Sequence, residues 1–282
     1  MSNHTFKKCI AAILTVSALA LAGCGNQTAE APEDTATVVK VGVVGEYNAQ
    51  WDTINEILAP ENIRVELVKY TDYAAPNRAL ADGDIDLNAF QHKAFLANDI
   101  AQMDYEICDI GDTIIAPLAL FNNKDRISSV EEIKDGDVIA IPSDLTNGGR
   151  ALKLLEAAGL IVCDPAKGYV PTKADITSYN VDIEIMESDS ATLANLLPDC
   201  AAAVINGGNA FTAGLNPLED SIFVEDVNPE NNEGVAQLVN VIAARTADQN
   251  NEVYAKIVEA YHTDAVRATI EEAYRNAFLC AW

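Results

Sequence analysis

The chain has little of the chemistry on which metalloenzymes and hydrolases depend. It contains three histidines and six cysteines among 282 residues, and no CxxC pair occurs. Zinc and iron sites need clustered Cys and His side chains, so no metal site is expected. The GxSxG elbow of serine hydrolases and the GxxxxGK loop of phosphate sites are also absent. Asp84 and Asp86 fall on one face of one strand, whereas a hydrolytic pair needs two opposed walls. The sequence therefore predicts no enzyme and no cofactor.

Basic residues are scarce as well. All 43 acidic residues but only 16 of the 18 Lys and Arg residues follow residue 23, so residues 24–282 carry a net charge of −27. Nucleic acid is not expected as a partner, because affinity for phosphate backbones comes from clustered Lys and Arg. An acidic surface also repels anionic lipid headgroups, so membrane association would rest on a lipid anchor alone. Any acidic ligand group must be captured by a local cation, which directs attention to single arginines.

The N-terminus has the pattern of an export signal. Lys7 and Lys8 precede an apolar run over residues 10–22. About 13 helical residues rise only about 20 Å, which is too short for the roughly 30 Å hydrocarbon core of a bilayer. Leu21-Ala22-Gly23-Cys24 resembles the lipobox of bacterial lipoproteins, which implies cleavage before Cys24 and lipid attachment to its sulfur. The alternative is an ordinary secretory cleavage site with an incidental cysteine. We expect a signal peptide at 1–23 and a lipidated, flexible tether at 24–37.

Four cysteines remain in the exported part of the chain, namely Cys108, Cys163, Cys200 and Cys280. Their even number and export permit disulfides in any of three connectivities. Each also lies in or beside an apolar stretch, which is typical of a buried free thiol. Both interpretations stay open at this level.

Strand-like and helix-like segments alternate along the chain, which favours an α/β protein with mostly parallel sheet. We expect strands near 38–44, 63–70, 85–89, 107–110, 138–141, 181–186 and 201–205, and helices near 51–58, 77–81, 93–102, 149–158, 191–197, 252–262 and 264–278. Two longer apolar runs, 113–121 and 238–244, would cross between two lobes. The expected first lobe comprises 38–121 with 238–282, and the second comprises 122–237.

The segment Gly83–His92 combines a short alternating strand with recognition groups. Ile85, Leu87 and Ala89 have the period-2 spacing of a strand, and Phe90 to His92 follow it. Ligands of open α/β sheets bind outside the carboxyl ends of the strands, so these side chains are candidates for one wall of a binding site. The alternative is a solvated turn with one core Phe.

A second candidate is Ile141–Arg150, in which a strand is followed by polar and Gly residues that lead into a helix. A helix N-terminus favours negative charge, and the planar guanidinium of Arg150 matches a carboxylate. Arg150 could instead pair with Asp144 or Glu156 on a solvated first turn.

Two asparagines complete the candidates. Asn206 ends the small apolar strand 201–205, where it could accept a hydrogen bond from an ammonium and donate one to a carboxylate, or act as a helix N-cap. Asn240 lies within the apolar run 238–242. A buried amide needs partners, so Asn240 either fixes a bend or faces a polar cleft.

These segments together resemble the methionine-binding lipoproteins of bacterial ABC importers. The resemblance extends from about residue 38 to 282, and its most specific motifs are Asn-Ala-Phe-Gln-His at 88–92 and Thr-Asn-x-Gly-Arg at 146–150; further matches are Tyr73-Ala-Ala-Pro-Asn77, Ala203-Val-Ile-Asn206, Ile222-Phe-Val-Glu-Asp226 and the terminal Trp282. It implies a type II periplasmic-binding-protein fold, in which two α/β lobes close on one amino acid. It also implies ligand-binding roles for six residues. Tyr73, Phe90 and His92 would line the side-chain pocket, Arg150 would pair with the ligand carboxylate, and Asn206 and Asn240 would hold the polar end.

The resemblance thus implies a receptor at the outer face of the cell membrane, held there by its lipid. It would capture L-methionine or a similar small zwitterion and deliver it to an ABC importer permease. Gly207-Gly208-Asn209 and Glu46-Tyr47-Asn48 depart from the family pattern, so a receptor for another small amino acid or a short peptide is the alternative. A lipid-anchored enzyme or a structural surface protein on the same fold is a weaker one.

Overall fold

The computed structural model describes residues 36–282 except 229, 231 and 233. The predicted signal peptide, the lipidation site Cys24 and nearly all of the tether lie outside the described residues. None of the helices formed by residues 36–282 has the length and apolarity needed to span a bilayer.

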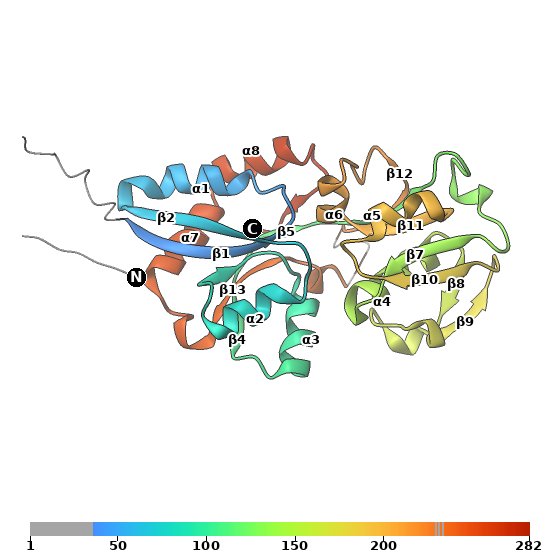
Figure 1. Ribbon diagram of the computed structural model, residues 1–282, viewed down its shortest axis with the longest axis horizontal. Coiled ribbons are helices and arrows are strands. Elements are labelled where there is room, and N and C mark those ends of the chain that lie inside the picture. The colour runs from blue at the N-terminus through green and yellow to red at the C-terminus, as the bar shows by residue number, and fades with distance from the viewer. Residues whose placement is uncertain (1–35, 229, 231, 233) are drawn as a thin grey trace, which may run out of the picture. The chain divides into compact units, whose positions relative to one another are not determined.

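The first of two five-stranded sheets has the strand order β2-β1-β3-β13-β4 (Figure 1). Strand β1 is parallel to β2 and β3, whereas β13 is antiparallel to β3 and β4. The strands are β1 (Thr37–Val44), β2 (Ile63–Tyr70), β3 (Leu87–Asn88), β4 (Ile107–Asp112) and β13 (Val241–Arg245), and the helices of this lobe are α1 (Gln50–Leu58), α2 (Ala75–Asp82), α3 (Lys93–Met103), α7 (Glu252–Tyr261) and α8 (Asp264–Ala273).

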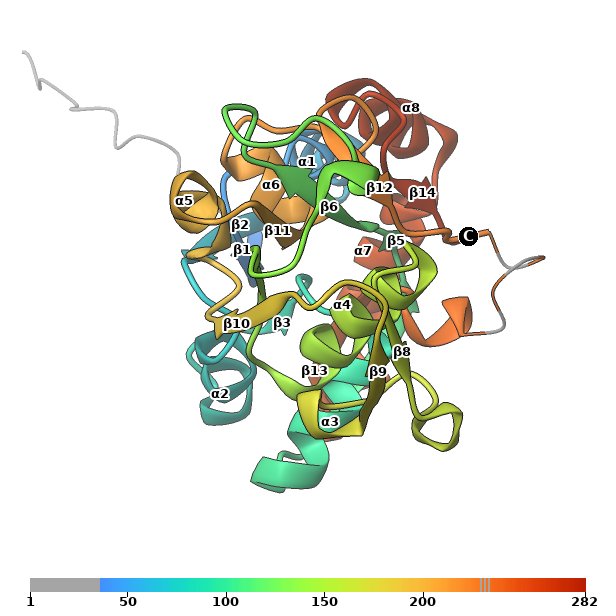
Figure 2. The ribbon, with the colours of Figure 1, turned by 90° about the vertical axis from the view of Figure 1, so that its right-hand side faces the viewer.

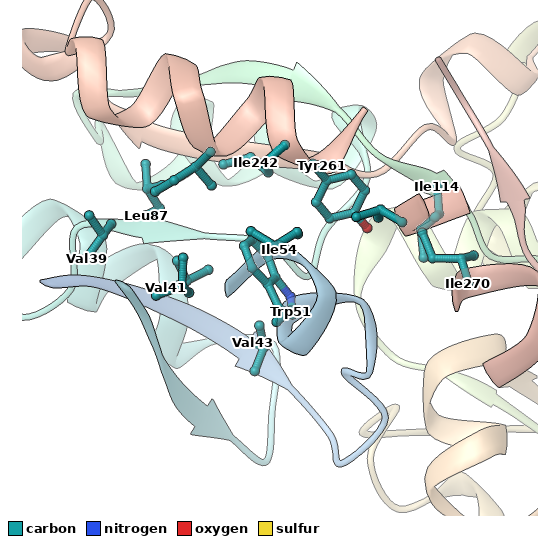
Figure 3. Packing of buried hydrophobic residues seen from close by; sticks show 14 of the residues in the cluster. Val39, Val41, Val43, Trp51, Ile54, Leu87, Ile114, Ile242, Tyr261 and Ile270 are labelled. Carbon is teal, nitrogen blue, oxygen red and sulfur yellow. The ribbon is translucent and has the colours of Figure 1, made fainter. Parts of the chain in front are cut away.

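The core of this lobe forms where β1 meets α1 and the C-terminal helices. Val39, Val41 and Val43 project from one face of β1 because strand side chains alternate. Trp51 and Ile54, three residues apart on α1, cover them (Figure 3). Each buried aliphatic side chain stabilises the fold by about 1.5–3 kcal/mol through removal of apolar surface from water.

The second sheet has the order β10-β7-β11-β6-β12, with β7 parallel to β10 and β11 and β6 antiparallel to β11 and β12. Its strands are β6 (Leu118–Asn122), β7 (Val138–Pro142), β10 (Glu184–Ser188), β11 (Ala202–Asn206) and β12 (Ser221–Val224), and its helices are α4 (Leu145–Ala157), α5 (Leu193–Leu196) and α6 (Gly207–Thr212). Figure 2 shows this sheet from its own side, with α4 beside α3 of the first lobe.

Two small strand pairs and several single turns complete the fold. Strand β5 (Ile114–Ile115) pairs with β14 (Leu279–Cys280), and β8 (Ile161–Cys163) pairs with β9 (Ile176–Tyr179). The 3-10 turns are Ala59–Glu61, Val130–Glu132, Pro165–Lys167, Lys173–Asp175, Leu197–Asp199, Val235–Gln237 and Thr246–Asp248.

The chain passes between the sheets twice, and the two crossing segments are joined by backbone hydrogen bonds. The Asn240 amide donates to Ile114 O at 2.7 Å, and the Thr113 amide donates to Asn240 O at 2.7 Å. The first crossing is not one long strand, because Ala116-Pro117 separates β5 from β6. Strand β6 already belongs to the second sheet, so we propose a lobe boundary near Pro117 in place of residue 121.

Other sequence-based expectations need correction. The sheets are mixed rather than mostly parallel, because β6 and β13 are antiparallel to their neighbours. Each of these strands enters its sheet from a crossing segment, whereas parallel neighbours are joined by a helical crossover within one sheet. The expected strand 85–89 is reduced to the two residues of β3. All four described cysteines are free thiols, as the second interpretation expects, but only Cys163 and Cys200 are buried, and Cys108 and Cys280 are partly exposed.

The first lobe should be sensitive to a cavity at Ile54, which is fully buried in its core. We expect Ile54→Ala to lower the free energy of unfolding by about 2–5 kcal/mol, measured by urea denaturation, because the lost contacts are not replaced. Glu56→Ala, on the exposed face of the same helix, is the control and should change it by less than about 0.5 kcal/mol. Equal effects of the two substitutions would contradict the described packing of α1.

Candidate ligand-binding site

A cavity of about 90 Å³ lies between the two sheets, and all six residues predicted from the sequence line it. Tyr73, Phe90, His92 and Asn240 reach it from the first lobe and the returning crossing, and Arg150 and Asn206 reach it from the second lobe. The structure therefore brings together residues that are up to 167 positions apart in the chain. Their role in holding a ligand stays a prediction.

One wall of the cavity is aromatic. The ring of Tyr73 lies 5.9 Å from that of Phe90 and 6.0 Å from that of Phe95, and Phe90 and Phe95 meet edge to face at 6.0 Å. Such tilted arrangements match the quadrupoles of the rings. Burial and nearby Asp144 raise the pKa of the Tyr73 hydroxyl, so it stays protonated and is able to donate a hydrogen bond. This wall offers an apolar surface to a ligand side chain.

A buried amide network holds the segment that carries Phe90 and His92. The side-chain oxygen Oδ1 of Asn77 accepts from Asn88 Nδ2 at 2.9 Å and from Gln91 Nε2 at 2.6 Å. Asn77 Nδ2 donates to Gln91 Oε1 at 2.7 Å. Asn77 and Asn88 are fully buried. Ala89 and Gln91 still form backbone bonds to Gly42 and Val241, so the network adds side-chain bonds to a segment that the backbone also holds.

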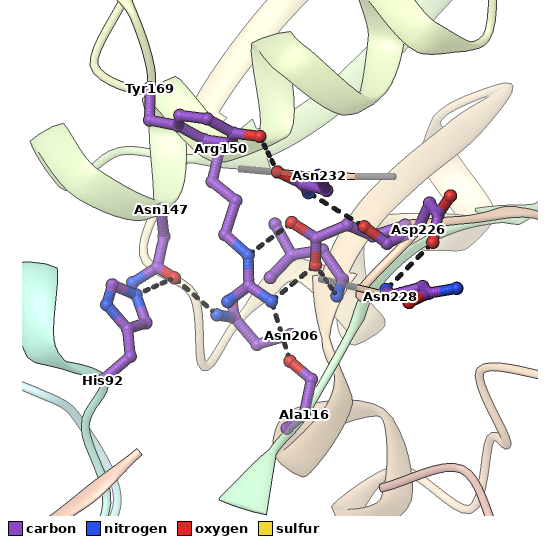
Figure 4. A network of polar contacts seen from close by, with 11 residues as sticks. His92, Ala116, Asn147, Arg150, Tyr169, Asn206, Asp226, Asn228 and Asn232 are labelled. Carbon is purple, nitrogen blue, oxygen red and sulfur yellow. Dashed lines mark hydrogen bonds and ion pairs between the residues drawn. The ribbon is translucent and has the colours of Figure 1, made fainter. Parts of the chain in front are cut away.

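His92 and Asn147 connect the two lobes across the cavity. His92 begins helix α3 as its N-cap, where Nδ1 accepts from the Phe95 amide at 3.1 Å. The remaining Nε2–H therefore donates to Asn147 Oδ1 at 3.2 Å. Asn147 Oδ1 also accepts from Asn206 Nδ2 at 2.8 Å, so one oxygen joins both lobes (Figure 4). Desolvation and the neighbouring Arg150 lower the pKa of His92 to about 3, which keeps the imidazole neutral.

Arg150 is buried and paired, but with neither of the residues expected as alternatives. Its Nε donates to one oxygen of Glu225 at 2.7 Å and its Nη2 to the other at 2.5 Å, and Nη2 also donates to Ala116 O at 2.8 Å (Figure 4). Helix α4 begins four residues earlier than expected, and Asp144 caps it by accepting from the Asn147 amide at 2.9 Å. The helix N-terminus is thus already satisfied by a carboxylate, and Arg150 lies on its second turn.

Asn206 lies both at the cavity and at the start of a helix, but its side chain does not cap that helix. It is the N-cap residue of α6, yet its side chain makes no capping bond and donates to Asn147 instead. Its side-chain oxygen Oδ1 is buried and has no partner among the described residues. A buried acceptor without a donor costs about 1–3 kcal/mol, so this oxygen is suited to a hydrogen-bond donor supplied by a ligand.

The structure adds residues that the sequence did not assign to the site. Asn147 and Glu225 lie within motifs that carried the resemblance, but only their contacts reveal their roles. Asn147 precedes Arg150 by three residues, a spacing that places both on one helix face and would have been a usable signal. No local pattern marks Glu225, which follows β12. Gly207 is also required, because a Cβ there would lie 2.8 Å from Phe278 and 2.9 Å from Pro117 O.

The described lining of the cavity contains one charged side chain, and that side chain is paired. Among the described residues that line it, Arg150 alone carries a formal charge, and Glu225 behind it compensates that charge. The remaining polar lining consists of amides, tyrosines and a neutral imidazole. A site of this kind can accept a ligand with one positive and one negative end.

The buried neutral state of His92 should make the fold sensitive to acid. The unfolded state takes up a proton near pH 6.5 and the folded state only near pH 3, so the stabilisation by neutral His92 is complete above pH 6.5 and is lost as pH falls toward 3. Over this range we expect His92→Gln to reduce the pH slope of the free energy of unfolding by up to about 1.4 kcal/mol per pH unit. Denaturant titrations between pH 4 and 7 measure it, with His262→Gln as the control. Equal slopes in all three proteins would contradict the neutral state.

Comparison with known proteins defines the relationship. The sequence profile of the NlpA lipoprotein family matches residues 39–282. The chain is 37% identical over 282 residues to a probable D-methionine-binding lipoprotein MetQ of Vibrio cholerae, covering 99% of this chain and all of that protein. Two solved structures are also similar. A nutrient-binding protein of Burkholderia cenocepacia bound to methionine has a TM-score of 0.80 at 30% identity, covering 86% of this chain and 100% of that one. The substrate-binding protein of a methionine transporter from Streptococcus pneumoniae has a TM-score of 0.80 at 34% identity, covering 87% and 96%.

The family match covers both sheets and every described residue that lines the cavity. The solved relatives share the two-lobed α/β substrate-binding fold, in agreement with the fold class expected from the sequence. The chain is a member of the NlpA lipoprotein family.

Proposed function

We propose that this protein is the lipid-anchored receptor of an ABC importer, and that it captures methionine or a close analogue between its lobes and delivers it to the permease. The observation that carries the proposal is a cavity that combines one paired cation, an unpartnered buried acceptor and a wall of aromatic rings. The names of the relatives, which refer to methionine binding and a methionine transporter, support the choice of ligand.

The proposed ligand fills the unsatisfied positions of the site. The ligand carboxylate would accept from Arg150 Nη1, since Nε and Nη2 are occupied by Glu225 and Ala116. The ammonium would donate to Asn206 Oδ1, with the Asn240 amide at the same polar end. The thioether side chain would then lie against Tyr73 and Phe90.

Simple energetics agree with this arrangement. Methionine has about nine heavy atoms, so the ceiling of about −1.5 kcal/mol per atom permits nanomolar affinity, which needs about −12.3 kcal/mol. Charged hydrogen bonds at Arg150 would contribute about 1.5–3 kcal/mol each. Sulfur–aromatic contacts add only about 0.3–1.5 kcal/mol, so discrimination against leucine would come mainly from the shape of the pocket.

Delivery to a permease requires the lobes to open. The two crossing segments are the covalent links between the lobes among the described residues, so a hinge motion there would release the ligand. In the described state the hydrogen bond between His92 and Asn147 closes the cleft. The lipid on Cys24 would hold the receptor at the outer face of the membrane, beside the importer.

A second candidate is a receptor for a short peptide, and one observation favours it. A side chain at Gly208 would meet no heavy atom within 4 Å, so the cavity could extend there. The small cavity volume of about 90 Å³ argues the other way, because an extended peptide needs more room than one amino acid.

Calorimetry across the twenty amino acids, with both enantiomers of methionine and a panel of methionine dipeptides, tests the ligand. We expect binding heat with methionine and a much weaker response to charged amino acids, because the site is neutral overall. Binding of a different solute with no response to methionine would overturn the choice of ligand while leaving the receptor class intact.

Arg150→Ala should weaken methionine binding at least tenfold, because the carboxylate loses its charged donor. The matched control is Lys124→Ala, which removes an exposed cation of the same lobe and should leave the dissociation constant unchanged. Circular dichroism verifies that both variants are folded. An unchanged affinity of a folded Arg150→Ala protein would remove this residue from the site.

A further inference from the structure

The pairing of Arg150 with Glu225 has a role beyond holding a side chain in place. The two side chains are 3% and 9% exposed, so both charges have been taken out of water. Such a pair costs several kcal/mol in desolvation and is often no more stable than an apolar replacement. Stability alone therefore does not explain its presence at the edge of a ligand cavity.

The geometry makes Glu225 part of the junction between the lobes. Glu225 follows β12, and its backbone amide donates to Leu118 O at 2.9 Å. Its Oε2 accepts from the Leu118 amide at 3.0 Å in addition to Arg150. The carboxylate is thus fixed by bonds from two segments, and it turns Nε and Nη2 of Arg150 away from the cavity. Within the described residues Nη1 makes no hydrogen bond, so a single N–H pair remains for a ligand.

The charge at the cavity also depends on Glu225. No Asp, Glu or Lys residue is among the described residues that line it. Without Glu225, the buried guanidinium of Arg150 would lose the carboxylate with which it is paired. Such a site would attract anions of any kind and repel an ammonium group.

We propose that Glu225 is a specificity-determining residue that acts through Arg150: it neutralises the guanidinium and so restricts the site to zwitterionic ligands over anionic ones. The inference rests on the proposed function, because it concerns the charge class of the same ligand. Glu225 does not touch the ligand in this scheme. It positions Arg150 and sets the electrostatic potential that the ligand ammonium meets.

A double-mutant cycle separates this role from a purely structural one. The four proteins are the wild type, Glu225→Gln, Arg150→Gln and the double variant, each folded by circular dichroism. The probes are L-methionine, a zwitterion, and N-formyl-L-methionine, an anion with the same side chain and carboxylate. The measured quantity is the dissociation constant for the anion divided by that for the zwitterion, by calorimetry.

We expect Glu225→Gln to lower this ratio at least tenfold. The carboxylate of Glu225 and the ligand ammonium, at about 10 Å and an effective dielectric constant of about 20, attract each other strongly enough to change the affinity for the zwitterion by that order. Asp226→Asn changes the net charge of the protein equally, but Asp226 is exposed, so water and salt screen its charge and the ratio should stay unchanged. Glu225→Asp keeps the charge and should retain the wild-type ratio even where both affinities fall.

Two results would overturn the inference. One is an equal loss of affinity for both probes in Glu225→Gln, which a structural role predicts. The other applies if Glu225→Gln does not fold: the double variant, which buries no unpaired charge, must then show a lower ratio than Arg150→Gln, and equal ratios would reject the role. If the wild type binds another amino acid in place of methionine, the ligand proposal fails, and that amino acid with its N-formyl derivative still decides the role of Glu225. A wild type that binds no amino acid would reject both proposals.

Discussion

The hydrogen bonds between the two crossing segments are the constraint on which the rest of the site depends. Asn240 exchanges backbone bonds with Thr113 and Ile114, and an isolated bridge pairs it with His92. The same junction continues at Leu118, which bonds to Glu225. Groups from both lobes are therefore placed relative to one another by backbone geometry, which is more exact than contacts between long side chains.

Most buried polar side chains of this site have hydrogen-bond partners within the protein, and few do not. The amides of Asn77, Asn88 and Gln91 satisfy one another, and Asn147 satisfies His92 from across the cleft. The acceptor of Asn206 is left over at the cavity itself. Asn206 Oδ1 and Arg150 Nη1 are open positions beside bonded neighbours, and such a network is pre-organised because its bonded members are already held in place.

The charge at the cavity differs in sign from the net charge of the chain. A chain with a large negative net charge does not attract the carboxylate of an amino acid through its surface potential. In the proposed scheme the attraction is concentrated in Arg150, and Glu225 behind that residue prevents repulsion of the ligand ammonium. Burial, and secondly this cation, lower the pKa of His92 and keep it neutral. The site thus separates local charge from the overall charge of the molecule.

The sequence alone predicted most of the secondary structure and several candidate site residues. Periodicity located most strands and helices within a few residues, because each has a clear apolar face, as in β1 and α1. Phe90, His92 and Asn206 were candidates because they follow strands, whose carboxyl ends are where α/β proteins bind ligands, and Arg150 because it is a cation near a helix start.

The tertiary structure decided which of these groups have partners and which are free for a ligand. It replaced Asp144 and Glu156 by Glu225 as the partner of Arg150, a choice that depends on a contact 75 residues away in the chain. It also gave Asn147 its place between His92 and Asn206, and it made the sheets mixed through the two crossings. Local sequence encodes periodicity and the chemistry of single side chains. Pairing across a cleft depends on how distant segments pack, which periodicity does not record.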